Sequence, residues 1–541
     1  MAEHRPKEQW ATRLGVIMAV AGSAVGLGNF LRFPAQAAEN GGGVFMVPYF
    51  CALLLLGIPI CWAEWTMGKI GARYGQHSCA AIFGRLGGHR AWRYLGVLAL
   101  VMPTIVYFYY VVVESWCLAY AWSYLRGTLD LGTNPAEYAQ RSAAVFTGFA
   151  GDNLDGFTFQ GRIHVSVWLW LVTIAANFWL VYRGISKGIE QFCNIAMPIM
   201  ALCAIAVLVR VLTLPPFAGD GETRTVLQGL GFMWNPKSFA ADQPAWQALA
   251  DTKVWLAAAG QIFFTLSVGF GVIVTYASYL KPKDDVVLSG LTASATNEFF
   301  EVCLGGLITI PAAFLFLGIA VASKGTFGLG FNALPIVFQY MPAGRWFGFI
   351  WFFMLFLAAI TSSLSLLQPV TAFLEEAMGV GRKGSVAIVA ALTGAGNLFV
   401  IYFSKNLAAL DTLDFWAAQV GILIFGTLEV LVLSWVLGAG RGYAAALEGA
   451  ELRPPRWVFT VLMRFITQAV LLAVFVLWCY YYAGDYVRRL GAGGVPAYAM
   501  GVIVAVLAFF LVMVYLADRR WGPELAGRGK VTEPVVQEPK P

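Results

Sequence analysis

Apolar runs of about 20 residues recur from one end of the sequence to the other, and each is long enough to cross the hydrocarbon core of a membrane. Charged residues make up only 12% of the 541 residues, whereas soluble domains carry about 25%. Inside lipid a segment must satisfy its own backbone hydrogen bonds, so separate runs of this length indicate helices. The sequence therefore predicts an all-α integral membrane protein with about twelve transmembrane helices.

The remaining composition argues against several classes of function. The net charge is +6, but the basic residues lie in short loops beside the apolar runs, which indicates membrane topology rather than a nucleic-acid partner. The 8 cysteines include no CxxC pair, and the 4 histidines lie near span ends or in loops. Because no nucleophile with a base, metal cluster or cofactor motif is present, we expect neither an enzyme nor a bound cofactor.

Basic residues mark alternate loops and so predict the topology. They precede the first span and follow the second, fourth, sixth, eighth and last, which by the positive-inside rule places these loops and both termini in the cytoplasm. We expect a single transmembrane domain over residues 1–520, in contact with the lipid of a bacterial inner membrane. The polar, Pro-rich stretch 521–541 is predicted to be a disordered cytoplasmic tail.

The first span is interrupted in its middle. Residues 14–40 (LGVIMAVAGSAVGLGNFLRFPAQAAEN) begin as an apolar helix, but Gly22, Gly26 and Gly28 then crowd together, and Asn29 and Arg32 follow. Helix-weakening glycines beside an amide and a charge are costly in hydrocarbon. Two explanations remain open: a broken span whose freed backbone groups line a binding site, or glycines that pack closely against a neighbouring helix.

A second interruption falls within residues 254–280, where Gln261, Thr265, Ser267, Gly269 and Gly271 cluster. Interrupted segments at corresponding places in two halves of a chain indicate inverted repeats. We expect repeat one over about residues 10–212, repeat two over about 252–440, and two extra helices over about 457–520. Because each repeat has five spans, the repeats have opposite orientations, and broken helices 1 and 6 should meet near the midplane.

Polar residues on two later spans are further candidates. Ala358, Thr361 and Ser362 share one helix face and offer oxygen ligands for a hard cation, although hydroxyls bonded to the preceding turn are the common alternative. Asn297 and Glu301 also share a face. A carboxylate at that depth is expensive and indicates function, the alternative being a polar pair with a neighbouring span.

Long motifs along the chain resemble the neurotransmitter:sodium symporter family, in particular its bacterial amino-acid transporters. In order from Trp10 they are WATRLGVIMAVAGSAVGLGNFLRFP, AAENGGGVFMVPY, YRGISKGIE, GQIFFTLSVGFG, VLSGLTA, TSSLSLLQP and LDFWAAQVG. The resemblance implies an alternating-access carrier in which the broken helices surround the substrate.

The resemblance also implies two sodium ions held only by oxygen, as suits a hard cation. One ion would bind the substrate carboxylate together with Ala24, Asn29, Thr265 and Asn297. The other would bind carbonyls and hydroxyls of Gly22, Val25, Ala358, Thr361 and Ser362. Glu301 would supply a fixed negative charge where chloride-dependent members have a serine, which implies a chloride-independent carrier with Glu301 as a candidate proton carrier.

The substrate contacts are implied in the same way. The carboxylate would meet Leu27, Gly28 and Tyr110, and the ammonium would meet Ala24, Phe264, Thr265 and Ser267. The side chain would lie among Val106, Phe264, Phe270, Ser362 and Leu366. Amine carriers of the family have an aspartate at the position of Gly26, so this glycine indicates an amino acid.

Two gates are implied as well. Arg32 and Asp414 would pair on the outer side of the substrate, and Lys7 and Glu376 would pair on the cytoplasmic side. Ser23 stands at the pocket edge, where the resemblance leads us to expect an amide, and its role is unassigned.

These residues predict a sodium-coupled symporter that imports small neutral, mainly aliphatic, L-amino acids such as leucine or alanine, as a monomer or a homodimer. One alternative is a symporter for aromatic or other bulky amino acids, which needs a wider pocket near Val106, Phe270 and Leu366. The other is a transporter-derived amino-acid sensor, which could dispense with the gates and sodium sites.

Overall fold

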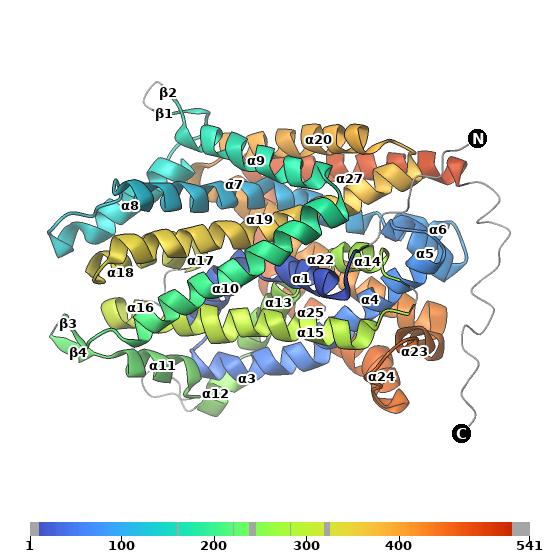
Figure 1. Cartoon of the computed structure of the whole chain (residues 1–541), viewed down its shortest axis with the longest axis horizontal. Helices are drawn as coiled ribbons and strands as arrows, with labels where there is room; N and C mark the ends of the chain where they lie inside the picture. The colour runs from blue at the N-terminus through green and yellow to red at the C-terminus, as the bar shows by residue number, and fades with distance from the viewer. Residues whose placement is uncertain are drawn as a thin grey trace.

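The computed structural model of the protein describes residues 10–159, 162–219, 221–236, 245–281, 283–318 and 325–521. It is a bundle of long helices that run roughly along its longest axis, with two short β-hairpins at one end (Figure 1). We call this end the hairpin end. The opposite end, where α5 (Cys79–Gly87) and α6 (Ala91–Leu95) lie, is the α5–α6 end.

The remaining elements follow in chain order. The helices of the first half are α1 (Arg13–Ala24), α2 (Phe33–Glu39), α3 (Gly43–Ala52), α4 (Ile58–Arg73), α7 (Leu98–Arg126), α8 (Tyr138–Ala150), α9 (Val165–Tyr182), α10 (Gln191–Leu212), α11 (Val226–Trp234) and α12 (Ala245–Ala250). Those of the second half are α13 (Thr252–Thr265), α14 (Val272–Ala277), α15 (Val286–Glu298), α16 (Leu307–Leu317), α17 (Gly325–Phe327), α18 (Leu334–Tyr340), α19 (Gly344–Ala377), α20 (Arg382–Tyr402), α21 (Ala408–Leu413), α22 (Ile422–Leu431), α23 (Ala439–Leu447), α24 (Arg456–Val461), α25 (Thr467–Trp478), α26 (Gly484–Gly491) and α27 (Val495–Arg520). The antiparallel hairpins pair β1 (Thr158–Phe159) with β2 (Arg162–Ile163) and β3 (Phe217–Gly219) with β4 (Glu222–Arg224).

Within the described ranges, ten helical segments are long and apolar enough to cross a membrane. An eleventh span is the bent pair Arg13–Ala24 and Gly28–Glu39, whose axes differ by 46°. α13 and α14 flank a further interruption at residues 266–271, so the described residues contain ten or eleven candidate spans and this second broken helix. The all-α membrane architecture with broken helices 1 and 6 is therefore confirmed.

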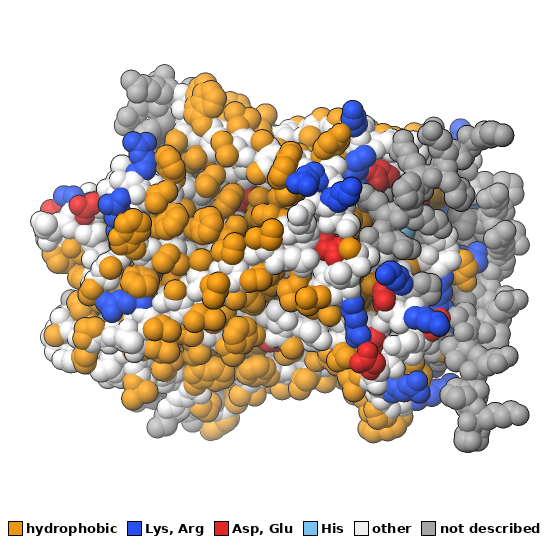
Figure 2. Space-filling model, in the orientation of Figure 1, with side chains coloured by type: hydrophobic (Ala, Val, Ile, Leu, Met, Phe, Trp, Pro, Cys, Tyr) orange, Lys and Arg blue, Asp and Glu red, His pale blue; other side chains and the backbone are white. Residues whose placement is uncertain are grey.

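Apolar side chains cover the middle of the bundle's surface. Figure 2 shows hydrophobic side chains over the middle of the visible face, with charged side chains gathered toward both ends. α9 and α10 contribute Trp168, Trp179 and Leu202, each more than half exposed. By contrast, 94% of the most apolar stretch of Ala91–Arg126 is buried. An apolar belt of this extent is the surface that meets lipid.

The start of α1 is tied to the segment before α10. Thr12 caps α1, its hydroxyl accepting the Gly15 N–H at 2.9 Å. The buried carboxylate of Glu190 accepts the backbone N–H of Ala11 at 2.9 Å and that of Thr12 at 3.2 Å. Gly15 permits this approach, because a Cβ there would overlap the Glu190 carboxylate. A carboxylate from a neighbouring span thus completes the helix cap.

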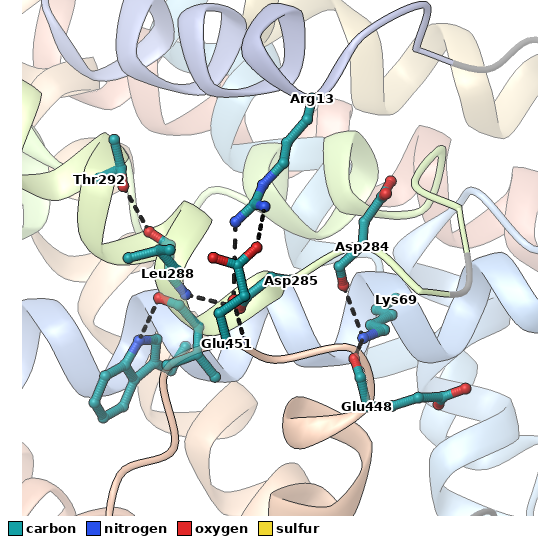
Figure 3. A network of polar contacts seen from close by, with 10 residues as sticks. Arg13, Lys69, Asp284, Asp285, Leu288, Thr292, Glu448 and Glu451 are labelled. Carbon is teal, nitrogen blue, oxygen red and sulfur yellow. Dashed lines mark hydrogen bonds and ion pairs between the residues drawn. The ribbon is translucent and has the colours of Figure 1, made fainter.

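A network of charged residues at the α5–α6 end joins further segments (Figure 3). Arg13 Nη1 lies 2.8 Å from Glu451 Oε1, and Arg13 Nη2 lies 3.8 Å from Asp285 Oδ2. The ammonium of Lys69 donates to the backbone carbonyl of Glu448. α1, α4, the start of α15 and the loop before α24 are therefore held together at this end.

Replacing Glu190 with alanine should destabilise the fold, because two backbone N–H groups at the start of α1 lose their acceptor. A cap of this kind contributes about 0.5–2 kcal/mol, so we expect a lower thermal-unfolding midpoint for the detergent-solubilised protein. The control is Glu451→Ala, which removes the exposed partner of Arg13 and should change the midpoint little. An unchanged midpoint for Glu190→Ala would contradict the role of this carboxylate.

Candidate ion and substrate site

The two interruptions lie against each other inside the bundle. Where α1 ends, Val25 takes extended backbone angles (φ −73°, ψ 97°). After α13, Ser267 and Gly269 adopt positive φ values of 53° and 76°. The Ser267 hydroxyl donates to the carbonyl of Ser23 at 3.0 Å. Both helices therefore open their backbone toward a shared space, which decides between the two explanations of the first glycine cluster.

A buried carboxylate holds the second interruption in place. Glu64 on α4 accepts the N–H of Gly269 at 2.5 Å, and a Cβ on Gly269 would overlap the carbonyl of Ile422. Glu429 on α22 lies close to Glu64 and is also fully buried. The motifs single out neither glutamate, but a carboxylate inside an apolar run is the signal that could have identified both.

One group of predicted residues meets where the two interruptions face α15 and the π-helical segment that continues it, Phe299–Gly306. We call it the Asn29 cluster; its members are Ala24, Asn29, Thr265, Asn297 and Glu301. The Asn29 amide donates to Asn297 Oδ1 at 2.8 Å and to Glu301 Oε2 at 3.2 Å. The Glu301 carboxylate also accepts from the Thr265 hydroxyl and, at 2.8 Å, from Gln261. The side chains of this network are almost completely buried.

One end of the Asn297 amide faces two carbonyl oxygens and an amide nitrogen at once. One end of the amide lies 3.2 Å from the carbonyl oxygen of Thr265, 3.3 Å from that of Ala24 and 2.8 Å from the Asn29 amide nitrogen. If the Asn297 oxygen occupies this end, it accepts from the Asn29 amide but faces the two carbonyl oxygens. If the Asn297 nitrogen occupies it, it donates to the carbonyls but faces the Asn29 nitrogen, which is also a donor. A cation bound to the Thr265 and Ala24 carbonyl oxygens and to the Asn297 side-chain oxygen removes this conflict. These three oxygens therefore suit a hard ion as ligands.

A second group lies where α1 breaks beside α19. We call it the Thr361 cluster; its members are Gly22, Val25, Ala358, Thr361 and Ser362. Ser362 Oγ lies 3.4 Å from the Gly22 carbonyl, 3.5 Å from that of Val25 and 3.1 Å from that of Ala358. Thr361 Oγ1 lies 2.9 Å from the Ala358 carbonyl. Three carbonyls thus surround two hydroxyls, an all-oxygen set that also suits a small cation.

A cavity of about 30 Å³ adjoins both clusters. Nine of the eleven residues predicted for the substrate line it: Ala24, Gly28, Val106, Tyr110, Phe264, Ser267, Phe270, Ser362 and Leu366. Of the other two, Leu27 donates its N–H to the Tyr110 hydroxyl at 3.2 Å, and Thr265 belongs to the Asn29 cluster. Ser23, Gly26 and Ser365 complete the lining. Ser365 lies within the motif TSSLSLLQP but was not a predicted site residue.

Gly26 is required by the tightness of this pocket. A Cβ on Gly26 would lie 2.6 Å from both Ser362 Oγ and Tyr110 Oη, closer than real Cβ atoms approach. Its N–H donates to Asn29 Oδ1 at 2.8 Å. A larger residue at this position would have to displace both hydroxyls.

The outer gate residues do not form the predicted ion pair in this structure. The Arg32 guanidinium lies 4.4 Å above the Phe264 ring. Asp414 accepts from the Tyr109 hydroxyl at 2.7 Å and from Gln419 at 3.0 Å, and no ion pair joins it to Arg32, both residues being among those described. A cavity of about 250 Å³ that Arg32 and Gln419 help to line lies on this side. Each of the two charged residues therefore has other partners in this structure.

The inner gate is described on one side only. One oxygen of Glu376, Oε2, accepts two backbone N–H groups just before α5, those of His77 and Ser78, each at 2.7 Å. The predicted partner Lys7 lies outside the described residues. Near this gate, the Trp10 indole N–H donates to the Tyr276 carbonyl at 2.9 Å.

Comparisons with known proteins agree with this architecture. Residues 7–521 match the Sodium:neurotransmitter symporter family. The chain is similar to an uncharacterised sodium-dependent transporter of Methanocaldococcus jannaschii, with 29% identity over 450 residues that cover 80% of this chain and 83% of the relative. It is also similar to an uncharacterised sodium-dependent transporter of Bacillus subtilis, with 32% identity over 384 residues that cover 71% and 76%.

One curated relative has a named substrate, and a solved structure has the same fold. A sodium- and chloride-dependent taurine transporter of Rattus norvegicus is 26% identical over 492 residues, covering 84% of this chain and 75% of the relative. The crystal structure of MhsT in complex with L-phenylalanine has a TM-score of 0.72 at 29% identity and covers 87% of this chain and 99% of MhsT. The chain is therefore a sodium-dependent transporter, not an enzyme, and belongs to the sodium:neurotransmitter symporter family.

Proposed function

We propose that the protein is a chloride-independent symporter that couples the inward flow of sodium to the import of small neutral, mainly aliphatic, L-amino acids. The observation that carries this proposal is the pair of oxygen-rich clusters beside one cavity at the meeting point of the broken helices. Such a site can bind ions and substrate together and can be reached from either side as the bundle moves.

The Asn29 cluster would bind the ion that couples to the substrate. A sodium ion among Ala24, Thr265 and Asn297 lies next to the cavity, so a substrate carboxylate there can complete its coordination. Without substrate the ion loses a ligand, and without the ion the carboxylate loses its counter-charge. Each ligand therefore raises the affinity of the other by the same factor. The Thr361 cluster would hold the second ion, independently of the carboxylate.

The backbone of the first interruption would bind the carboxylate. The Leu27 N–H and the Tyr110 hydroxyl already lie in hydrogen-bond contact at 3.2 Å, and the Gly28 N–H follows next along the chain. Donors of this kind favour an anion. Ala24, Phe264 and Thr265 carbonyls would accept from the ammonium. With Gly26 in place of a carboxylate side chain, the substrate must bring its own negative charge.

The side-chain end of the pocket favours a small substrate. Val106, Phe264, Phe270 and Leu366 form apolar walls around a free space of about 30 Å³, and burial of apolar surface against them supplies affinity. An aromatic amino acid is the second candidate, because MhsT was crystallised with L-phenylalanine. It would require Phe270 or Leu366 to move outward.

Transport would proceed by two alternating gates, with repeat one (10–212) and repeat two (252–440) moving against each other. The hairpin end would face outward, and the α5–α6 end, with both termini, would face the cytoplasm of a bacterial cell. Arg32 and Asp414 would approach each other when the outer cavity closes, whereas Lys7 and Glu376 would part on the inner side. Two copies could associate as a homodimer without altering this site, which lies within one chain.

Sodium coupling is tested with purified protein in sealed vesicles that contain potassium. Labelled alanine or leucine should accumulate when sodium is present outside, because the ion gradient drives the substrate inward. Replacement of external sodium by potassium should abolish accumulation. Equal accumulation in the two salts would overturn the proposal.

Asn29→Ala should weaken sodium and amino-acid binding together, because one side chain organises both the ion cluster and the backbone next to the carboxylate. Binding of labelled alanine is measured as a function of sodium concentration. A matched control is Asn397→Ala, which removes another fully buried amide, bonded to the Tyr107 and Phe108 carbonyls away from the cavity. Loss of neither affinity in Asn29→Ala would refute its role.

Glu301→Ser should create a requirement for chloride. The Glu301 carboxylate is surrounded by donors from Gln261, Asn29 and Thr265, and these would face an anion once the carboxylate is removed. Uptake by this variant is compared in chloride and in gluconate. The control Glu298→Ser removes the neighbouring carboxylate, which accepts from Tyr49 at 2.7 Å, and should stay indifferent to chloride. Indifference of Glu301→Ser as well would contradict the charge assignment.

A further inference from the structure

Two serine hydroxyls face each other inside the substrate cavity. Ser23 on α1 and Ser365 on α19 both line it, and they are 3% and 1% exposed. Ser23 Oγ donates to Ser365 Oγ at 2.7 Å. Neither residue belongs to the two ion clusters, and neither has a role in the transport scheme above.

Both hydroxyl hydrogens of this serine pair donate hydrogen bonds within the protein, but the Ser23 oxygen can still accept one. Ser365 Oγ donates to the Ser362 carbonyl at 2.6 Å, so the Ser23 hydrogen is committed to Ser365 and the Ser365 hydrogen to the backbone. A hydroxyl oxygen can accept two hydrogen bonds. Among the described residues, no donor reaches Ser23 Oγ, because the nearby Ser267 hydroxyl is bonded to the Ser23 carbonyl instead. The pair therefore offers an acceptor to a group in the cavity.

The pair lies at the side-chain end of the pocket. Ser365 precedes the apolar wall residue Leu366 and lies one turn beyond Ser362 on α19. The donors for a carboxylate are Leu27, which follows the break in the first span, and Tyr110 on α7. A substrate held by its carboxylate there would direct its side chain toward the hydroxyl pair and the apolar walls.

We propose that the Ser23–Ser365 pair is a polar subsite that accepts a hydrogen bond from a substrate side chain, and that the substrate class therefore includes small hydroxy amino acids, threonine and serine. This inference rests on the proposed amino-acid transport. Threonine and valine have the same shape and differ only in a hydroxyl and a methyl group. A purely apolar pocket would prefer valine, because it would bury the threonine hydroxyl without a partner. The acceptor reverses that preference.

The preference should be modest rather than absolute. When an aliphatic substrate is bound, the two hydroxyls remain bonded to each other and to the Ser362 carbonyl, so no buried donor is left unpaired. A neutral hydrogen bond of this kind changes affinity by about two- to tenfold. The pocket is thereby able to take alanine and valine while favouring threonine.

The test is competition against labelled alanine by threonine and valine, in saturating sodium, on the full chain in detergent. The wild-type protein should bind threonine about two- to tenfold more tightly than valine. The double variant Ser23→Ala/Ser365→Ala removes both acceptor oxygens that line the cavity and should reverse this order, with alanine binding still dependent on sodium. Ser363→Ala is the matched control, because this buried serine of α19 is bonded to Asn177 at 2.6 Å instead of lining the cavity; its threonine-to-valine ratio should equal the wild-type ratio.

Two results would overturn the inference without affecting the proposed function. One is a wild-type protein that binds valine at least as tightly as threonine in a sodium-dependent manner, which needs no variant to fold. The other is an unchanged ratio in the double variant Ser23→Ala/Ser365→Ala. If neither amino acid binds in a sodium-dependent manner, the proposed function itself fails, which is a distinguishable outcome.

Discussion

The structure depends on one constraint: a helix that is broken inside a membrane must find partners for the backbone groups it frees. Water is not available there, and each unpaired group costs several kcal/mol. Here the partners come from neighbouring spans. The Glu64 carboxylate accepts a hydrogen bond from the N–H of Gly269, and the Ser267 hydroxyl donates one to the carbonyl of Ser23. What these side chains leave unsatisfied, chiefly the carbonyl oxygens around Asn297 and Ser362, is what ions can use.

The same constraint explains why several positions in the site accept only one type of amino acid. Gly26 and Gly269 are fixed by close neighbours, and Gly269 also by its positive φ. These glycines let neighbouring groups approach the broken backbone closely. The Glu64 carboxylate, which does not line the cavity, supports the backbone of the second interruption by accepting the Gly269 N–H.

The sequence predicted the helical membrane fold and the two interruptions, because polar residues and glycines within apolar runs have few structural explanations. Most of the cavity lining was predicted from the family resemblance alone. It did not predict Glu64, Glu429 or Ser365 as parts of the site. Glu64 and Glu429 lie on spans without a break, and Ser365 lies one turn beyond the predicted Ser362. Only three-dimensional contacts relate these residues to the interruptions. The Arg32–Asp414 pair was predicted from resemblance, but an ion pair across a gate depends on conformation. In this conformation a cavity separates the outer segments, whereas Trp10 and Glu190 hold α1 at the α5–α6 end.

The central claim is that substrate and sodium share a carboxylate beside the Asn29 cluster. The most direct measurement is the affinity for radioactive sodium in the presence of leucine and, separately, of 3-methylbutylamine, which is leucine without its carboxylate. Leucine should raise the sodium affinity, and the amine should leave it unchanged at any concentration. An amine that raises the sodium affinity as much as leucine does would contradict coupling through the carboxylate.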